Sequence, residues 1–180
     1  MTVGELRDFL LSPLATPAVL AGLAKGVLPE VAAAVAKLMG NKDLVFVAAK
    51  MRTVTRCRNT LGEKGIFAVR VQPNHPTDDV TGILVAALEG LSFGCGDAVI
   101  GVNPAADSVE SVSALLHGLD RLVETLGVPT QHCVLAHATT QLAALSAGAP
   151  IDLLFQSVAG TQAANSSFGI TLDLLKEGRG

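Results

Sequence analysis

The sequence predicts an α/β protein, with an N-terminal helical segment followed by four consecutive βα units that form half of a TIM-type (β/α)8 barrel. Two observations lead to this prediction. After Gly62 and Gly65, short apolar runs bounded by turns alternate with longer stretches of helical periodicity. Hydrophobic residues make up 49% of the chain and charged residues only 16%, which suits parallel strands buried on both faces. We place the helical segment at residues 1–62 and the four units at residues 63–180, within one structural unit overall.

The helical segment is predicted from signals for helix starts. Thr2 and Glu5 have the spacing of a capping box, in which each side chain accepts a hydrogen bond from the other residue's backbone N–H. Pro29 suits the first turn of another helix, because it has no N–H to leave unbonded there. We expect helices over residues 2–11, 29–38 and about 42–58, with short helices and loops between the first two.

The βα units follow in a regular order. Each strand is predicted from a short apolar run, and the helices from capping signals and apolar residues at helical spacing. Thr77 supplies an N-cap and Asp78 and Asp79 supply first-turn carboxylates for the first of these helices, while Asp107 begins the second. The predicted order is strand 66–71, helix 77–91, strand 98–102, helix 107–126, strand 133–136, helix 139–147, strand 153–157 and helix 161–176.

Four such units fit two architectures, a small doubly wound sheet and half of an eight-stranded barrel. Both use right-handed crossovers, so periodicity does not choose between them. A complete barrel typically needs about 250 residues, so a chain of 180 residues does not close an ordinary one by itself. Half a barrel leaves its first and fourth strands as open edges, which a partner or further sequence must cover.

Composition argues against several classes of protein. A net charge of −3 and a pI near 5.7, without a long Lys/Arg run, give the chain no general positive electrostatic field for binding nucleic acid. Three cysteines far apart suggest thiols in a reducing cytoplasm. The N-terminus does not resemble a secretory signal, and the apolar stretch 12–40 is not expected to span a membrane because charged residues and prolines interrupt it.

Polar residues follow or end the predicted strands and point to a shared site. They are Arg70 and Gln72, then Asn103, then His137, then Gln156. The carboxyl ends of parallel strands meet at one edge, where such folds bind ligands. A guanidinium and several amides suit binding a small polar molecule more than attacking it. The alternative is structural, with Arg70 paired to a carboxylate and the amides capping loops.

Other polar residues have ordinary explanations beside the functional ones. His75 and His137 invite acid/base or metal roles, but their spacing matches no zinc signature, and loop or helix-entry roles are favoured. Asp78 and Asp79 invite a cation, but the helix dipole explains carboxylates in a first turn, and the same holds for Asp107. No metal site is predicted from residues of this chain.

Several motifs together resemble one family. They are Arg70–Asn74 (RVQPN), Gly90–Gly94 (GLSFG), Gly96–Pro104 (GDAVIGVNP), Pro129–Gln131 (PTQ), and Phe155–Ser157 (FQS) with Gly160. In this order and register the chain is similar, over nearly its whole length, to the large, catalytic subunit of ethanolamine ammonia-lyase.

The resemblance implies a β/α-barrel enzyme that uses adenosylcobalamin to convert ethanolamine to acetaldehyde and ammonia by a radical mechanism. It implies that Arg70, Gln72 and Asn103 contact ethanolamine, with Arg70 the catalytic residue among them, and that Pro104 and Gln156 contact the cobalamin. The cobalt is held by the cofactor. Implied partners are a small subunit and the remainder of the large subunit in an oligomer, in the cytoplasm or within a bacterial microcompartment.

The chain also departs from the family. The family subunit is more than twice as long, and two carboxylates that hold the substrate ammonium come from later strands, without a counterpart here. A buried cation needs anionic compensation. We therefore expect this chain to supply one wall of the substrate site, and we expect the isolated chain to be inactive. Two alternatives stay open, a non-enzymatic module that binds a small polar ligand or a partner subunit, and a doubly wound sheet with unrelated chemistry.

Overall fold

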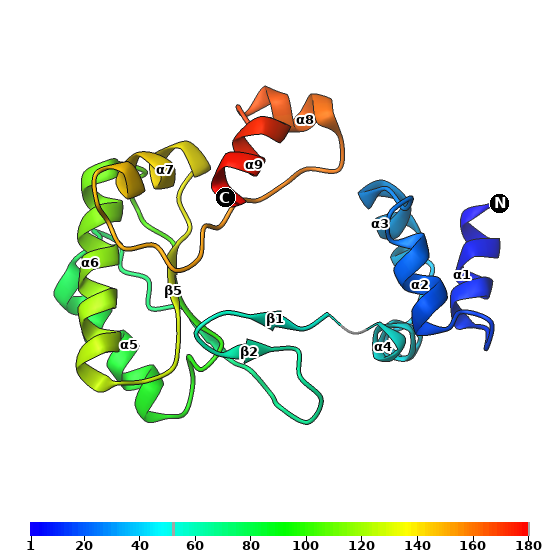
Figure 1. Cartoon of the computed structure of the whole chain (residues 1–180), viewed down its shortest axis with the longest axis horizontal. Helices are drawn as coiled ribbons and strands as arrows, with labels where there is room; N and C mark the ends of the chain where they lie inside the picture. Colours follow the sequence, from blue (N-terminus) through cyan, green and yellow to red (C-terminus); the bar gives the residue numbers. More distant parts are fainter. Residues whose placement is uncertain (52, 180) are drawn as a thin grey trace. The chain divides into compact units, whose positions relative to one another are not determined.

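The structure is a computed structural model that describes residues 1–51 and 53–179. The chain divides into two units (Figure 1). The first, which we call the helical unit, contains Met1–Thr53 and Ala159–Gly169, and the second, which we call the sheet unit, contains Val54–Val158 and Ile170–Gly180. The division into domains at residues 62 and 63 stays a prediction.

The helical unit confirms the helix starts that were predicted from local signals. Its helices are α1 (Val3–Leu11), α2 (Pro17–Leu23), α3 (Pro29–Lys37), α4 (Asn41–Lys50) and α8 (Gln162–Ser167). The capping box of α1 is present, with Glu5 N donating to Thr2 Oγ1 at 3.2 Å and Thr2 N donating to Glu5 Oε2 at 2.6 Å. Proline stands in the first turn of α3 as predicted.

The helix predicted over 42–58 is too long. It ends at Lys50, whose Nζ donates to the backbone oxygens of Leu10 at 2.7 Å and Ser12 at 2.8 Å. Further along, Thr55–Arg56 (β1) pairs antiparallel with Thr60–Leu61 (β2) as a hairpin. Position 52, which the prediction also covered, lies outside the described residues. The hairpin was missed because its two-residue strands carry no apolar alternation.

The sheet unit is built on a parallel sheet. In the part of the chain that the structure describes, its strands are β3 (Arg70–Val71), β4 (Val99–Val102) and β5 (His132–Val134), in the order β3-β4-β5. Arg70 lies opposite Val99, and Ile100 lies opposite His132. The helices of this unit are α5 (Val80–Ser92), α6 (Val109–Leu126), α7 (Ala138–Ser146) and α9 (Leu172–Arg179).

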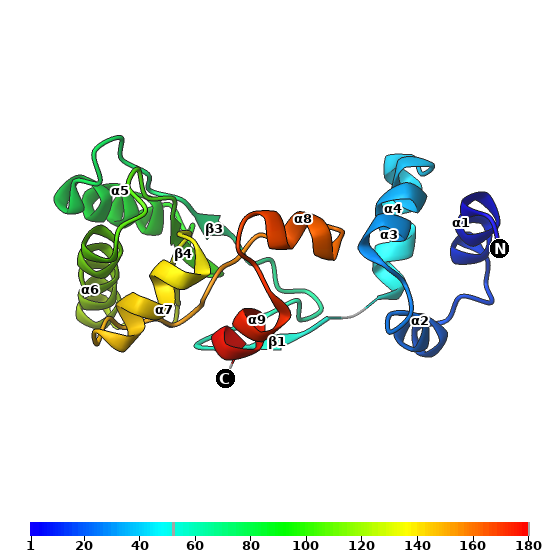
Figure 2. The same ribbon diagram turned by 90° about the horizontal axis from the view of Figure 1, so that it is seen from above.

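The core lies on one side of this sheet. Helices α5, α6 and α7 cover that side (Figures 1 and 2), where Ile100, Val102 and Val134 point toward them. Helix α6 contributes a stripe of buried side chains at helical spacing, Val112, Leu115, Leu116, Leu119 and Val123. Since side chains alternate along a strand, Gly101 and Cys133 face the other side, away from the helices.

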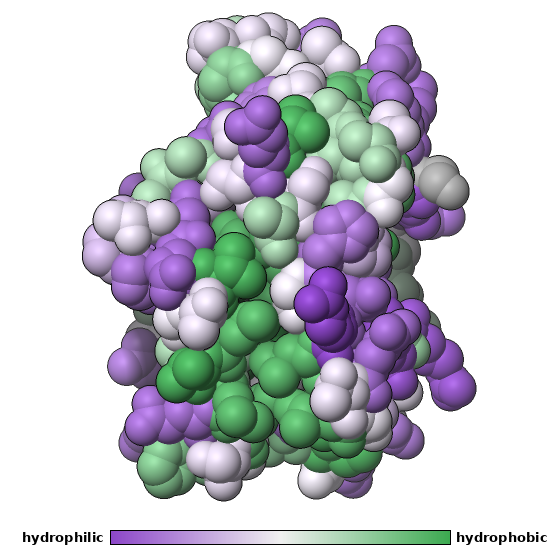
Figure 3. Space-filling model, turned by 90° about the vertical axis from the view of Figure 1, so that its left-hand side faces the viewer, coloured by the Kyte–Doolittle hydropathy of each residue, from purple (hydrophilic) through white to green (hydrophobic). Residues whose placement is uncertain are grey.

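The surface of α5 and α6 is unusually apolar in places. Figure 3 shows hydrophobic side chains gathered on the face of the molecule where these helices lie. The exposed apolar residues of α5 include Val85 at 62% and Leu88 at 46%, and Phe93 directly after the helix is 78% exposed. Exposure of this size on one helix is typical of a surface that contacts another protein chain.

The predicted mixed α/β class is confirmed, with several corrections. Residues 153–157, all described, form no strand, because the Gln141 side chain occupies the backbone groups of Phe155: its Oε1 accepts from Phe155 N at 3.2 Å, and its Nε2 donates to Phe155 O. The helix predicted over 161–176 is two helices, α8 and α9, separated by Gly169 at a φ of 82°. The first strand is shorter than predicted. Among the described residues no barrel closes.

Candidate functional site

The polar residues predicted to form a site lie at and beyond the carboxyl ends of the parallel strands. We call Arg70, Gln72, Asn103, Pro104, His137 and Gln156 the carboxyl edge. Because β3 and β4 are parallel and in register, Arg70, Gln72 and Asn103 fall on the side of the sheet away from the helices. Arg70, Gln72 and Asn103 are exposed, and Pro104, His137 and Gln156 are half-buried.

The guanidinium of Arg70 lies against the backbone of the neighbouring strand. A Cβ atom built on Gly101 would be 2.7 Å from its Nη2, 2.8 Å from its Nε and 2.9 Å from its Cζ. Any side chain at residue 101 would therefore displace the guanidinium. A lone glycine within an apolar strand is a signal of such a close approach, so Gly101 could have been found in the sequence.

Arg70 has no carboxylate partner among the described residues. The structural alternative, in which Arg70 forms an ion pair, is therefore wrong for this part of the chain. The Arg70 guanidinium interacts electrostatically with Cys133, the residue opposite Gly101 on β5. Burial raises the pKa of the Cys133 thiol, and the Arg70 guanidinium opposes this rise. The thiol is thus a neutral, buried wall of the edge.

The three amides of the carboxyl edge differ in what they bind. The side chains of Gln72 and Asn103 make no hydrogen bond to any described residue. Gln156, in contrast, accepts from Ala138 N at 2.8 Å through Oε1 and donates to Ser157 O at 2.9 Å through Nε2. The loop-capping alternative therefore describes Gln156, while the donors and acceptors of the Gln72 and Asn103 side chains are not used by any described residue.

Both histidines have the structural roles that were favoured. His137 is the N-cap of α7, where its ring Nδ1 accepts from Thr139 N at 3.3 Å. The ring Nδ1 of His75 lies 3.2 Å from Thr77 Oγ1 and accepts from Asp79 N at 3.4 Å within the turn before α5. Neither arrangement resembles a metal site, and no group of three or more potential ligands occurs among the described residues.

The roles predicted for the acidic residues need correction. Asp79, and not Thr77, is the N-cap of α5 and accepts from Gly82 N at 2.7 Å. Asp107 does not cap α6, which Ser108 does; its carboxylate accepts from His137 N at 3.1 Å. The Asp78 carboxylate likewise accepts hydrogen bonds from a neighbouring loop. Local spacing identified helix starts correctly to within a few residues, but it contained no signal for these contacts between loops.

A cluster of charged side chains connects the β1–β2 hairpin to the parallel sheet. Arg58 Nη2 lies 3.3 Å from Asp120 Oδ1 and 2.9 Å from Asp152 Oδ1. Both carboxylates are also 3.3 Å from Nε2 of His132, which is fully buried. His132 precedes Cys133 on β5, so its side chain points to the face of the sheet opposite to that of Arg70, Gln72 and Asn103. We regard this cluster as structural.

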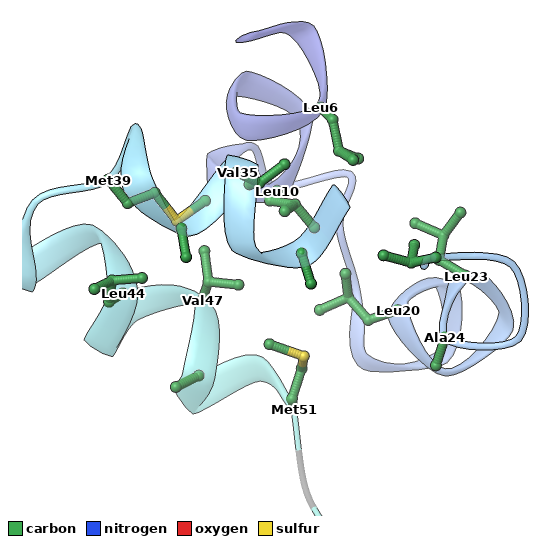
Figure 4. A pocket seen from close by; sticks show the side chains of 14 residues that line it. Leu6, Leu10, Leu20, Leu23, Ala24, Val35, Met39, Leu44, Val47 and Met51 are labelled. Carbon is green, nitrogen blue, oxygen red and sulfur yellow. The ribbon is translucent and has the colours of Figure 1, made fainter. Parts of the chain in front are cut away.

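A well-defined apolar pocket lies within the helical unit (Figure 4). Its volume is about 410 Å³, and its lining is entirely apolar, including Leu6, Leu10, Leu20, Val35 and Met51. Such a lining offers no group to orient a small polar molecule, so the pocket is not a substitute for the carboxyl edge. None of the described helices is long and apolar enough to cross a membrane.

Comparison with known proteins gives a consistent result. The whole chain, residues 1–180, matches the family model described as "Ethanolamine ammonia lyase large subunit (EutB)". It is 44% identical over 178 residues to the ethanolamine ammonia-lyase large subunit of Escherichia coli strain K12, covering 99% of this chain and 39% of that protein. The large subunit of Salmonella typhimurium strain LT2 is 43% identical over the same length, with the same coverage. The chain therefore spans about two fifths of the length of these relatives.

Proposed function

Because the chain belongs to the ethanolamine ammonia-lyase large-subunit family, we propose that it supplies one wall of a site where ethanolamine is converted to acetaldehyde and ammonia. The observation that carries this proposal is the free donor set of the carboxyl edge: Arg70 without a carboxylate partner, beside the unbonded amides of Gln72 and Asn103.

The chemistry of these groups suits the hydroxyl end of ethanolamine. The guanidinium of Arg70 donates to the substrate oxygen, and Asn103 holds the same oxygen from the neighbouring strand. Gln72 carries both a donor and an acceptor, so it bridges the hydroxyl and the amine. Holding a small, flexible molecule at several points in this way fixes its orientation for reaction.

The ammonium end needs anions, and the described carboxylates near the edge, Asp78 and Asp107, are already bound to loop backbone. A carboxylate close to the bound substrate would lie within reach of Arg70, and none pairs with it among the described residues. A cation taken out of water requires a partner of opposite charge. We infer that two carboxylates from another part of the complete large subunit provide it.

The same edge fits contacts with adenosylcobalamin, which supplies the radical chemistry when bound. The corrin presents apolar surface and amide groups, so a protein wall needs apolar and amide partners for it. Half-buried Pro104 offers the former. Gln156 has used one lone pair and one N–H, and it keeps one of each for a ligand. No residue of this chain is proposed to bind the cobalt.

For the architecture, we propose that β3, β4 and β5 are the first strands of a β/α barrel completed by the rest of the large subunit. Their consecutive order, with the following helices on one side, supports this arrangement. We further propose assembly with a small subunit into an oligomer, in the bacterial cytoplasm or in a microcompartment. The exposed apolar residues of α5 support contact with another chain.

A chimeric enzyme tests the proposal. Residues 1–180 replace the matching region of the Escherichia coli large subunit, and the product is purified with its small subunit and supplied with adenosylcobalamin. We expect ethanolamine-dependent acetaldehyde formation from the chimera and none from the isolated chain. Acetaldehyde formation by the isolated chain would contradict the one-wall proposal.

Within the chimera, Arg70→Ala should lower kcat/KM for ethanolamine on the order of a thousandfold, as loss of a donor to a reacting oxygen does in other enzymes. Arg56→Ala is the matched control, because Arg56 is an exposed arginine of the hairpin. Similar kinetics for both variants would remove Arg70 from the site.

A further inference from the structure

We propose that Asp78 is a positioning residue whose carboxylate holds the segment Asn103–Ala106 and thereby sets where Asn103 and Pro104 lie. This inference rests on the proposed function, because those two residues are its substrate and cofactor contacts. Nothing in the family resemblance concerns Asp78, and the sequence suggested only a first-turn role for it.

The carboxylate of Asp78 binds the neighbouring loop at two points and the first turn of α6 at a third. Its Oδ1 accepts from Ala105 N at 2.7 Å, and its Oδ2 accepts from Ala106 N at 2.9 Å and from Ser111 Oγ at 2.9 Å. Asp78 belongs to the loop after β3, whereas all three donors follow β4. Hydrogen bonds to a charged group are among the stronger ones in proteins, so this contact fixes one loop against the other.

A fourth bond completes the attachment. Asn74, from the same loop as Asp78, accepts from Asn103 N at 2.9 Å through Oδ1. Pro104 has no N–H, so every backbone N–H between Asn103 and Ala106 is bound by the loop that follows β3. The side chain of Asn103 is left free, while its backbone is held.

The backbone of Asp78 has a conformation that is uncommon for residues other than glycine. Its φ is 53°, and it is the one non-glycine residue with a positive φ in ranges 1–51 and 53–179. Glycine adopts this conformation at lower cost, and asparagine tolerates it well. Aspartate adopts this backbone conformation less readily than glycine, but its carboxylate makes the two bonds to the neighbouring loop and the bond to Ser111 of α6.

The charged form of this carboxylate is the one the site stabilises. Burial acts to raise the pKa of Asp78, but the N–H groups of Ala105 and Ala106 and the hydroxyl of Ser111 outweigh it. The pKa therefore lies below its usual range, and Asp78 is ionised at neutral pH.

Asp79 provides a matched control. It is the next residue, also an aspartate, and its carboxylate faces its own helix by capping α5 at Gly82 N. Asparagine caps helices about as well as aspartate, so Asp79→Asn should leave both loops in place. Asp78→Asn removes the charge and one acceptor, and Asp78→Gly removes the whole carboxylate while easing the backbone.

The first test measures amide hydrogen exchange by NMR in the 180-residue chain. Asp78→Gly should speed exchange at Ala105 and Ala106 by about tenfold or more, with a smaller effect for Asp78→Asn and none for Asp79→Asn. Asn74→Ala should instead speed hydrogen exchange mainly at the Asn103 amide. If the Ala105 and Ala106 amides are unprotected in the unaltered chain, or are unaffected by Asp78→Gly, the proposal is wrong.

The second test measures kinetics in the chimeric enzyme. Asp78→Gly should lower kcat/KM for ethanolamine about tenfold or more, since Asn103 loses its position, while Asp79→Asn stays within about twofold. Asp78→Asn should recover part of the loss. An unchanged kcat/KM for Asp78→Gly in an active chimera overturns the positioning role. An inactive unaltered chimera with the expected exchange result refutes the proposed function and leaves the loop attachment standing.

Discussion

The apolar pocket of the helical unit and the carboxyl edge of the sheet unit present side chains of opposite character. The pocket encloses about 410 Å³ among aliphatic side chains and presents no hydrogen-bonding group. The edge carries Arg70, whose guanidinium has no ion pair among the described residues, and two amides, Gln72 and Asn103, whose side chains make no hydrogen bond to a described residue. An apolar lining excludes water but cannot orient a hydroxyl or an amine. The two regions show that a cavity and a set of free polar groups are separate properties, and recognition of a small polar molecule depends on the second.

Among substitutions that leave the proposed ligand contacts themselves unchanged, the largest effect that separates the two regions is expected from Gly101→Ala. The added Cβ would lie 2.7 Å from Arg70 Nη2, so the guanidinium must move. A displacement of about 1 Å at a site can cost about a hundredfold in rate, and we expect a loss of that size in kcat/KM of the chimera. The melting temperature should change little, because the displaced group is the end of a flexible side chain.

Gly22→Ala in α2 is the control for this substitution, since a Cβ at Gly22 meets nothing within 4 Å. It should leave the kinetics unchanged. Equal kinetics for Gly101→Ala and Gly22→Ala would mean that the position of Arg70 has no role.

A stability effect without a kinetic one is expected from the pocket. Leu20 lines it and is 6% exposed. Leu20→Ala should cost about 2 kcal/mol in the free energy of unfolding, at the low end for buried leucines because one side already faces a cavity. Chemical denaturation measures this loss, and KM for ethanolamine in the chimera should stay the same. A raised KM would show that the pocket contributes to substrate binding.

Within the carboxyl edge, leucine substitutions of Gln156 and Gln72 should also differ, one lowering stability and the other weakening substrate binding, with smaller effects. Gln156→Leu leaves the N–H of Ala138 without its acceptor, so we expect a loss of about 1 kcal/mol in stability. Gln72 has no partner to lose, so Gln72→Leu should be close to neutral for unfolding while weakening ethanolamine binding. Equal destabilisation by the two variants, measured by urea unfolding, would contradict the division into bonded and free amides.

The smallest effect concerns pH. A carboxyl with a lowered pKa in the folded protein adds stability at any pH above its unfolded pKa, and loses it as pH falls through the folded one. Protection of the Ala105 and Ala106 amides should therefore be constant from pH 7 to about 5 and fall below about pH 4. The protection of the Leu119 amide in the core serves as the reference. In the Asp78→Asn variant, the protection of Ala105 and Ala106 should no longer change with pH relative to that of Leu119.

Elements with local signals could be predicted from the sequence. The Thr2 and Glu5 capping box, Pro29 at the start of α3 and the apolar stripe of α6 each depend on residues close together in the chain, and all are present. Arg70, Gln72 and Asn103 could be brought to one edge because parallel strands share it. The quoted motifs also identified the family.

The rest depends on contacts between distant residues. The hairpin at 55–61 is held in part by Gln131, whose Nε2 donates to Asn59 Oδ1 at 2.8 Å across 72 positions. The segment at 153–157 fails to become a strand because of Gln141, and Asp78 and Asp107 bind loops other than their own. No periodicity or spacing contains such information. Gly101 is the exception, because a glycine inside a strand was visible and could have been interpreted.

The bonds between neighbouring loops restrict how this scaffold can be redesigned. Asn74 and Asp78 bind the backbone of the second loop, Asp107 binds that of the third, and Gln156 reaches back to the third from the fourth. An insertion in any one loop would therefore shift an acceptor that its neighbour needs. Loops of enzymes are usually exchanged one at a time, but here they should be transplanted as adjacent pairs, with the acceptor and the backbone it binds moved together.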